Sequence, residues 1–400
     1  MEGAEAGHPP ETTGPQVHTG SATQRNDQHH SLIELPSIEV GTGEVLIPPD
    51  ERALIDAEAP TIAKPVEDIA EDRSWLSHRL LNVRTIVSFV FAFLLIIFIF
   101  KNLNINIADT WKTMRTANPL FLVGGFVVYY SAFWLRAARW KQLLNNVGYD
   151  KEQVTLPSIN GLVEIIYLSW FVNCIVPAKL GDAYRSYLLK RNSGVSFSTT
   201  IGTILAERVI DLLVLFGLLS VSFALVGTHL SQPNGFNLGL VMVLGAVMVA
   251  ILIAGLVVLR FFSGFILRFV PHRFRDMFTR FQHGLLKSFT RKGLPMLAGY
   301  TVLIWLFESG RLFFVTRSLD AHDVTLSAVI FIALLSSLIT TIPATPGGAG
   351  LVEGAVILAL GLFLKDQPHL VVSIALLDRL INYWSLVVGG LVLYLLSKRK

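Results

Sequence analysis

Three uncharged apolar stretches constrain this chain more than any other feature. Residues 85–100, 118–135 and 236–259 contain no charged side chain. The hydrocarbon core of a bilayer is about 30 Å thick, and an α-helix needs about 20 apolar residues to cross it. The 400-residue chain is 52% hydrophobic and only 16% charged, which is too apolar for one soluble fold of this size. We therefore predict an all-α polytopic membrane protein.

Three further apolar stretches are long enough to span although charged residues interrupt them. They are 198–224 with Glu207, Arg208 and Asp211, 295–318 with Glu308 and Arg311, and 369–396 with Asp378 and Arg379. A charge at the bilayer centre costs about 2.5–3.5 kcal/mol on insertion scales, so such residues face a polar interior. Arg208 and Asp211 are three residues apart, as are Glu308 and Arg311, so each pair can partly neutralise itself on one helix face.

Two more apolar segments, 157–190 and 325–364, are broken near the middle by the sequences PAKLG and PATPGGAG. Each is either a re-entrant hairpin or a pair of crossings. Broken backbone at membrane depth is tolerated only where it lines a cavity or is buried in protein, so the breaks mark a site. The break residues are Pro177, Gly181, Pro343, Pro346, Gly347, Gly348 and Gly350.

The two broken segments belong to an internal repeat. Residues 177–181 and 343–347 share the pattern P-A-x-x-G, and 30 and 35 residues further on the chain reads ERVID at 207–211 and DRLIN at 378–382. Two matches in the same order and at similar spacing indicate a duplication. With three full spans in each half, the second half is inverted relative to the first, which is a transporter architecture. The predicted fold has six full spans and two re-entrant hairpins.

Lys and Arg set the predicted orientation, because cytoplasmic loops retain them. Lys and Arg occur before the first span, at the end of the second span (Arg136, Arg139 and Lys141) and after the first hairpin. They also recur through 260–292 and at the end of the chain, whereas 225–235 contains none. Both termini are therefore predicted to be cytoplasmic, with the protein in the cytoplasmic membrane.

The same reading divides the chain. Residues 1–72 carry fifteen Asp and Glu against three Lys and Arg and are predicted to form a disordered acidic tail. The first membrane repeat is 73–235 and the second is 236–400. Within the basic loop 260–292, a helix with Phe274, Phe278, Phe281 and Leu285 on one face would suit an anionic inner leaflet. A plain inward-facing loop that obeys the charge rule is the alternative.

The residues around the breaks suggest an anion site. Helices predicted to restart after Gly181 and after Gly350 present free N–H groups, and arginine binds phosphate oxygens in pairs. The candidate substrate-binding residues are Arg136, Arg139, Asn173, Lys179, Asp182, Arg185, Glu207, Arg208, Arg311, Glu353 and Arg379. The alternative is that Asp182 and Glu353 only cap their helices and that the cations only set the membrane topology. No catalytic residue, metal or cofactor is assigned.

Two further groups of residues, glutamates and tryptophans, are given more general roles. Glu164 lies on the way into the first hairpin, and Glu207 and Glu353 have no obvious local partner, so any of the three is a candidate carrier of a coupling proton. The tryptophans near helix ends or inside the bundle are expected to act as aromatic anchors. They are Trp134, Trp140, Trp170 and Trp384.

The chain resembles the transmembrane-region family of lysylphosphatidylglycerol synthetases, which are flippase-like integral membrane proteins. The resemblance covers about residues 85–395. It rests on Arg139-Trp140, the run N-x-x-x-P-A-x-x-G-D-x-x-R from Asn173 to Arg185, Glu207-Arg208, Pro343 to Glu353, and Arg379 with Tyr383-Trp384. Members handle aminoacylated phospholipids or polyprenyl-linked glycans, so the resemblance implies lipid handling. Because the chain ends soon after its last span, we expect no soluble aminoacyl-transfer domain.

Three functions are compatible with these features. The first is a flippase that moves a phospholipid or polyprenyl-phosphate-linked lipid with an anionic headgroup through a polar cavity between the hairpins. The second is a membrane transferase acting on a lipid phosphate, with Asp182 or Glu207 as base. The third is a non-catalytic membrane partner of a lipid synthetase or glycosyltransferase. Expected partners are the phosphate-bearing lipid, anionic inner-leaflet lipids and such an enzyme, but not nucleic acid, because the inside-positive rule already places the cations.

Overall fold

The computed structural model describes residues 106–149, 155–176, 180–227, 238–341 and 345–399, together with five positions between 90 and 101. The chain divides into the units Met1–Ala53 and Leu54–Lys400, and every described residue belongs to the second. These residues form helices without strands. The predicted tail 1–72 and most of the predicted span 85–100 lie outside the described residues.

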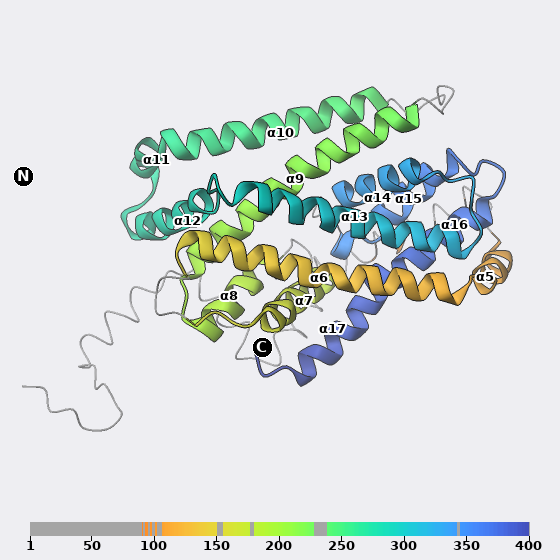
Figure 1. The fold of residues 1–400 in the computed structure, drawn as a ribbon, viewed down its shortest axis with the longest axis horizontal. Coiled ribbons are helices and arrows are strands. Elements are labelled where there is room, and N and C mark those ends of the chain that lie inside the picture. The colour runs from red at the N-terminus through yellow and green to blue at the C-terminus, as the bar shows by residue number, and fades with distance from the viewer. Residues whose placement is uncertain are drawn as a thin grey trace, which may run out of the picture. The chain divides into compact units, whose positions relative to one another are not determined.

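The helices follow one another as the apolar pattern predicts. In chain order they are α5 (Ile107–Arg115), α6 (Pro119–Val147), α7 (Ile159–Ile175), α8 (Gly181–Ser193), α9 (Phe197–Gly227), α10 (Leu238–Phe261), α11 (Ser263–Phe269), the 3-10 turn η2 (His272–Phe274), α12 (Arg275–Lys287), α13 (Leu294–Ser318), α14 (Leu326–Thr340), the 3-10 turn η3 (Pro346–Gly348), α15 (Leu351–Gly361), α16 (Pro368–Arg379), the π-helical turn η4 (Leu380–Trp384) and α17 (Ser385–Leu396). Figure 1 shows their arrangement.

Four stretches of helix are long and apolar enough to cross a membrane. Within the part of the chain that the structure describes, they are Pro119–Val147, Phe197–Val226, Leu294–Ser318 and Pro368–Leu396. A fifth candidate is the pair Gly245–Phe261 and Ser263–Phe269, which meet at 85°. The predicted span 236–259 thus ends in a sharp bend, beyond which α11 and α12 make up most of the basic loop.

The central pair of the bundle is α6 and α13, which lie side by side and run in opposite directions (Figure 1). The backbone N–H of Asn118, before α6, donates to the carbonyl oxygen of Ser318, at the end of α13, over 2.7 Å. At the other end of the pair, the Asn146 side chain donates to the carbonyl oxygen of Ser288, ahead of α13, over 2.9 Å. This antiparallel pairing brings the charged residues of the two helices to the same level.

The structure corrects the predicted end of the second span. The sequence places Arg136 and Arg139 where the span stops, yet α6 continues to Val147 and both side chains are buried. The helix continues because carboxylates on other helices match both charges, so neither arginine has to reach water.

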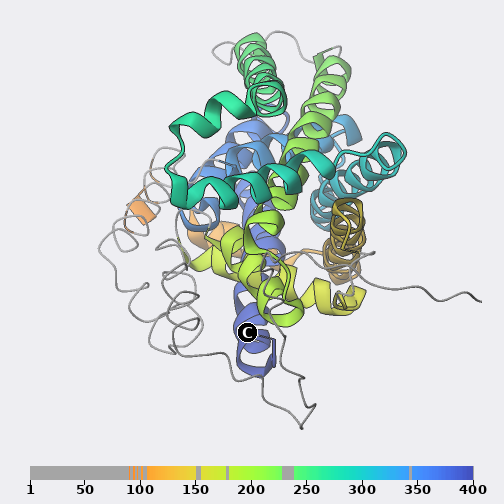
Figure 2. The same ribbon diagram turned by 90° about the vertical axis from the view of Figure 1, so that its left-hand side faces the viewer.

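The outer side of the bundle is apolar. Helix α10 packs along α9 at the edge of the bundle, as both ribbon views show (Figures 1 and 2). Exposed valine and isoleucine side chains, among them Val243, Val247 and Ile251, cover it, as expected of a helix that faces lipid. The basic helix α12 packs on α9 and buries Leu285 completely, so part of the apolar face predicted for a leaflet is used inside the protein.

Candidate functional site

A cavity of about 440 Å³, lined by both apolar and charged side chains, lies where the broken segments meet the central helices. Its described lining includes charged and amide side chains from α6, α7, α8, α9, α13, α16 and η4. They are Arg136, Arg139, Asn173, Asp182, Glu207, Arg208, Asp211, Glu308, Arg311, Arg379 and Asn382. The volume falls within the range of about 300–1,000 Å³ typical of small-molecule sites.

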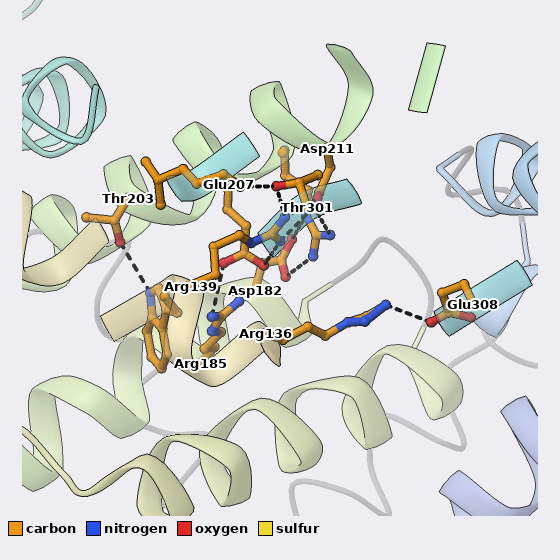
Figure 3. A network of polar contacts seen from close by, with 12 residues as sticks. Arg136, Arg139, Asp182, Arg185, Thr203, Glu207, Asp211, Thr301 and Glu308 are labelled. Carbon is orange, nitrogen blue, oxygen red and sulfur yellow. Dashed lines mark hydrogen bonds and ion pairs between the residues drawn. The ribbon is translucent and has the colours of Figure 1, made fainter. Parts of the chain in front are cut away.

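A cluster of ion pairs forms the wall between α6, α8 and α9 (Figure 3). The guanidinium of Arg139 lies 3.0 Å from an oxygen of Glu207 and donates to Asp211 over 3.1 Å and to Thr301 over 2.7 Å. The other oxygen of Glu207 lies 3.1 Å from Arg185. Buried charges need such multiple partners, because each isolated charge would cost several kcal/mol to desolvate.

The ion pair between Asp182 and Arg208 is the accessible part of this cluster. Arg208 Nη2 donates to Asp182 Oδ1 over 2.8 Å and joins the N-terminus of α8 to α9. The Arg208 side chain is 37% exposed and that of Asp182 is 24% exposed. The other described arginines of the lining, Arg136, Arg139, Arg311 and Arg379, are exposed by 7% or less.

A second cluster joins α13, α15 and α16. Arg311 donates to the Asp378 carboxylate, and Arg379 Nε donates to Glu353 over 2.9 Å. Arg379 also donates to the carbonyl oxygens of Gly347 and Gly348 in the second break. The other oxygen of Glu353 accepts the backbone N–H of Gly350 over 2.7 Å, so one carboxylate holds both the helix start and the arginine.

A further buried ion pair joins α6 and α13. Arg136 on α6 donates to Glu308 on α13 over 2.6 Å, and Figure 3 shows the two side chains pointing toward each other. The guanidinium of Arg136 lies 4.5 Å from the ring centre of Trp170, and Arg185 lies 3.8 Å from that of Trp140. Flat guanidiniums stack well on aromatic faces, which desolvates them at low cost.

The structure brings most of the predicted site residues to this cavity. Eight of them line it: Arg136, Arg139, Asn173, Asp182, Glu207, Arg208, Arg311 and Arg379. Arg185 and Glu353 lie one step behind, paired with Glu207 and Arg379. Of the break residues, Gly347 and Gly348 line the cavity, whereas Pro177 and Pro343 lie outside the described residues, as does Lys179.

Both ion pairs predicted between residues three apart are present, and the structure adds detail to them and to Asn173. The Asn173 side-chain oxygen accepts the Gly181 N–H over 2.8 Å, so it caps the start of α8. The pairs three residues apart are the longer contacts, 3.9 Å for Arg208 with Asp211 and 3.6 Å for Arg311 with Glu308. Their shorter ion pairs go to other helices, because packing offers better geometry than a single helix face.

The three glutamates considered as proton carriers all have partners distant in sequence. Glu207 and Glu353 lie in the arginine clusters, and Glu164 accepts from Ser397 over 2.6 Å and lies 3.1 Å from Arg399. Trp140, expected to be an anchor, is fully buried beneath Arg185, whereas Trp134 and Trp384 are half-exposed.

Sequence reasoning missed several residues of the lining. Asp211 and Glu308 were predicted as ion-pair partners only, and a set of aromatic and hydroxyl residues was not assigned to the site. These aromatic and hydroxyl residues are Tyr129, Trp305, Ser336, Ser337, Thr340, Thr341, Thr345 and Tyr383. Asp211 ends the repeated motif ERVID, and that position was the signal available. In the described ranges, no group of three or more His, Cys, Asp or Glu side chains is placed to hold a metal ion.

Comparison with known proteins places the whole membrane part in one family. The family described as lysylphosphatidylglycerol synthase TM region matches residues 85–390. A UPF0104 membrane protein of Methanocaldococcus jannaschii is 34% identical over 233 residues, 57% of this chain and 95% of the relative. A second, from Pyrococcus horikoshii, is 23% identical over 325 residues, 74% of this chain and 92% of the relative.

A third relative differs in name. Glycosyltransferase AglD of Haloferax volcanii is 24% identical over 328 residues, 72% of this chain, and the match spans 50% of that relative. The resemblance noted from the motifs is confirmed by the family match over 85–390. The chain is therefore an integral multi-pass membrane protein that belongs to the lysylphosphatidylglycerol synthase transmembrane-region family.

Proposed function

We propose that this protein is a flippase, which moves a lipid with a phosphate-bearing headgroup between the two leaflets of the cytoplasmic membrane. The observation that carries the proposal is the exposure of Arg208. Among the described cations of the cavity lining, it is the one with a substantially exposed side chain, and a single short ion pair holds it. A phosphate that replaced Asp182 at Arg208 would keep the guanidinium paired. Binding would therefore leave no uncompensated charge on the arginine.

The contacts of the two halves support the proposed repeat. Asp182 pairs with Arg208 and Glu353 pairs with Arg379, and the partners are 26 residues apart in both cases. In each half, an acidic residue in the first turn of the helix after the break binds the arginine of the ERVID or DRLIN motif. A chance match of motifs would not reproduce the same contact.

The central helices support inversion of the second half. Arg136 lies three residues before Arg139, which binds Glu207, the first residue of ERVID. In the same way, Glu308 lies three residues before Arg311, which binds Asp378, the first residue of DRLIN. Arg136 and Glu308 bind each other between antiparallel helices. Equivalent positions meet each other across an approximate two-fold axis, which is the signature of an isologous interface.

The lengths of the broken segments support re-entrant hairpins. Helix α7 has 17 residues, α14 has 15 and α15 has 11. At 1.5 Å per residue, even α7 reaches only about 25 Å, short of a bilayer core of about 30 Å. We propose six full spans, two hairpins and cytoplasmic termini, with the inward-facing loops marked by Lys and Arg.

Transport would proceed by exchange of ion pairs. The headgroup enters the cavity, its phosphate takes the place of Asp182 at Arg208, and the two halves then rock against each other about the α6–α13 contact. Alternating exposure of a fixed central site is how inverted-repeat transporters work. The acyl or prenyl chains remain in lipid while the headgroup uses the polar path.

A transferase acting on a lipid phosphate is less well supported. Its candidate bases, Asp182 and Glu207, lie 2.8–3.1 Å from arginine nitrogens. Glu207 would have to leave its ion pairs with Arg139 and Arg185 before it could accept a proton. The name of the Haloferax volcanii relative concerns that protein, of which the match covers half.

The test is lipid exchange in proteoliposomes that hold fluorescent phosphatidylglycerol, with dithionite added outside to bleach the outer leaflet. We expect the wild type to accelerate exchange and Arg208→Gln to slow it at least tenfold, because a charge-assisted contact contributes about 1.5–3 kcal/mol. Arg280→Gln, on the exposed face of α12, is the matched control and should exchange at the wild-type rate. Exchange by Arg208→Gln at the wild-type rate would refute the proposed site.

A further inference from the structure

Helix α11 is short and carries an exposed aromatic face. It begins after an 85° bend at the end of α10, at the turn that leads into α12 (Figure 1). Four phenylalanines at the bend and on α11 are exposed by 57–74%: Phe261, Phe262, Phe265 and Phe269. Phe265 and Phe269 are one helical turn apart, and their ring centres lie 5.1 Å from each other. The described part of the chain leaves these rings uncovered.

The bend sets the direction of α11 relative to the membrane. Because α10 is a candidate span, a helix that is bent away from it by 85° lies close to the membrane plane. Helices in that plane bury an apolar face about 5–10 Å into the boundary between headgroups and acyl chains and keep their charges among the headgroups. The exposed phenylalanines continue the apolar surface of α10 and fit this depth.

An open hollow of about 480 Å³ lies beside the aromatic face, between α11, η2 and the start of α12. Its lining includes Arg268, His272 and Arg275. Arg275 Nε donates to the carbonyl oxygen of Val270 over 3.2 Å, which holds the guanidinium at the turn. The terminal nitrogens of Arg275 are left to bind another group. The hollow therefore presents fixed hydrogen-bond donors next to exposed rings.

The charges around the hollow favour an anion with apolar chains. Among the described residues, no carboxylate forms an ion pair with Arg268 or Arg275, and Asp276, which also lines the hollow, is paired with Arg280. Guanidiniums bind phosphate oxygens in pairs, and juxtamembrane cations attract anionic lipids. A soluble anion would use the arginines but leave the phenylalanines in water. A phospholipid would cover both.

The inside-positive rule accounts for the number of cations between 260 and 292 but not for their placement around a hollow. Lys287, for example, is exposed in the same stretch and does not line the hollow. The structure also moves the aromatic face from where the sequence predicts it. On α12, Leu285 is buried, whereas the phenylalanines of α11 stay exposed.

We infer that the turn formed by α11, η2 and the start of α12 binds an anionic phospholipid of the adjacent leaflet. The phosphate lies between Arg268 and Arg275, and the acyl chains lie along Phe265 and Phe269. The site shares no lining residue with the cavity at Arg208. The inference goes beyond the proposed flippase function and does not depend on it, because the bound lipid stays in its leaflet and holds the end of α10 at the membrane surface.

Photo-crosslinking tests the site in the full chain. The protein is placed in phosphatidylcholine nanodiscs with a small share of phosphatidylglycerol or phosphatidylcholine that carries a diazirine on an acyl chain, and cross-linked peptides are identified by mass spectrometry. We expect phosphatidylglycerol to cross-link to residues 261–279 about tenfold more than phosphatidylcholine does. Arg268→Gln and Arg275→Gln should each reduce this preference about fivefold, the value of one arginine near an anionic surface.

The matched control is Lys287→Gln, which removes an exposed cation of the same basic stretch outside the hollow. It should leave the preference unchanged. The double variant Phe265→Ser, Phe269→Ser should reduce cross-linking by both lipids, because the rings hold α11 among the acyl chains. The inference is overturned by equal cross-linking of the two lipids in the wild type, by equal losses in Lys287→Gln and Arg268→Gln, or by full cross-linking in the double variant.

Inorganic phosphate distinguishes a lipid from a soluble anion. Added against chloride of the same ionic strength, it should leave cross-linking by phosphatidylglycerol unchanged, because it gains no contact with the phenylalanines. Displacement of phosphatidylglycerol by inorganic phosphate would assign the hollow to a soluble anion and overturn the lipid site. Residues 261–279 do not line the cavity at Arg208, so their cross-linking reports on this site whether or not the protein exchanges lipids between leaflets.

Discussion

At the scale of single residues, Gly181 shows how tightly the first break is built. A Cβ atom at this position would lie 2.0 Å from the backbone oxygen of Ser169 and 2.6 Å from the Asn173 side chain. The Gly181 N–H also donates to Asn173. Glycine lets α8 begin directly against α7, and this contact places Asp182 at the cavity.

The expected result of Gly181→Ala is a loss of stability of about 1–3 kcal/mol or more, because the methyl group meets backbone and cannot be accommodated by a rotamer change. Gly217→Ala is the control, since a Cβ there has open space and alanine favours helix by up to about 1 kcal/mol. Thermal unfolding in detergent, followed by tryptophan fluorescence, measures both. Equal unfolding temperatures for the two variants would contradict the close contact.

At the scale of helices, two equivalent ion pairs hold the helices after the breaks in different surroundings. The Arg208 side chain at the first pair is 37% exposed, whereas the Arg379 side chain at the second is 6% exposed. Arg379 also holds the glycine carbonyl oxygens of the second break. The second ion pair is therefore enclosed by the protein, whereas the first is partly exposed at the cavity.

We therefore expect Glu353→Gln to destabilise the protein by about 3–5 kcal/mol, because it leaves the buried Arg379 charge without its carboxylate. Asp182→Asn should cost about 1 kcal/mol or less, since water reaches Arg208. Unfolding in detergent over a range of temperatures compares the two variants. Greater destabilisation by Asp182→Asn would show that the first pair is the structural one.

At the scale of the whole molecule, the proposed topology puts the two ends of α13 on opposite sides of the membrane. Lys292 precedes this helix and Asp323 follows it, and both residues are exposed. The basic stretch around Lys292 is proposed to face the cytoplasm, and the loop at Asp323 is proposed to face outward.

Single-cysteine variants test this directly, since Cys174, the one native cysteine, can be replaced by alanine. A membrane-impermeant maleimide added to intact cells should label Asp323→Cys and not Lys292→Cys. Permeabilised cells should label both, which controls for reactivity. Labelling of Lys292→Cys alone in intact cells would invert the proposed orientation.

The sequence by itself determined which segments are helices in lipid and where they break. Apolar runs such as 236–259 have no stable alternative in a bilayer, where every backbone group must bond within its own segment. Pro and Gly at the breaks act on the local backbone alone, so α8 and α15 begin near Gly181 and Gly350 as predicted. The repeated motifs also marked four of the charged residues that line the cavity, Glu207, Arg208, Asp211 and Arg379.

Only the tertiary structure decided how those charges pair. Arg136 meets Glu308 across 172 residues, and Arg311 prefers Asp378 on another helix to the glutamate on its own. Such choices follow from the antiparallel packing of α6 and α13, which no local pattern encodes. The hydroxyl-bearing residues of the cavity lining, such as Ser336, Thr340 and Thr345, were missed for the same reason, because a serine or threonine looks the same in sequence whether it faces lipid, protein or a cavity.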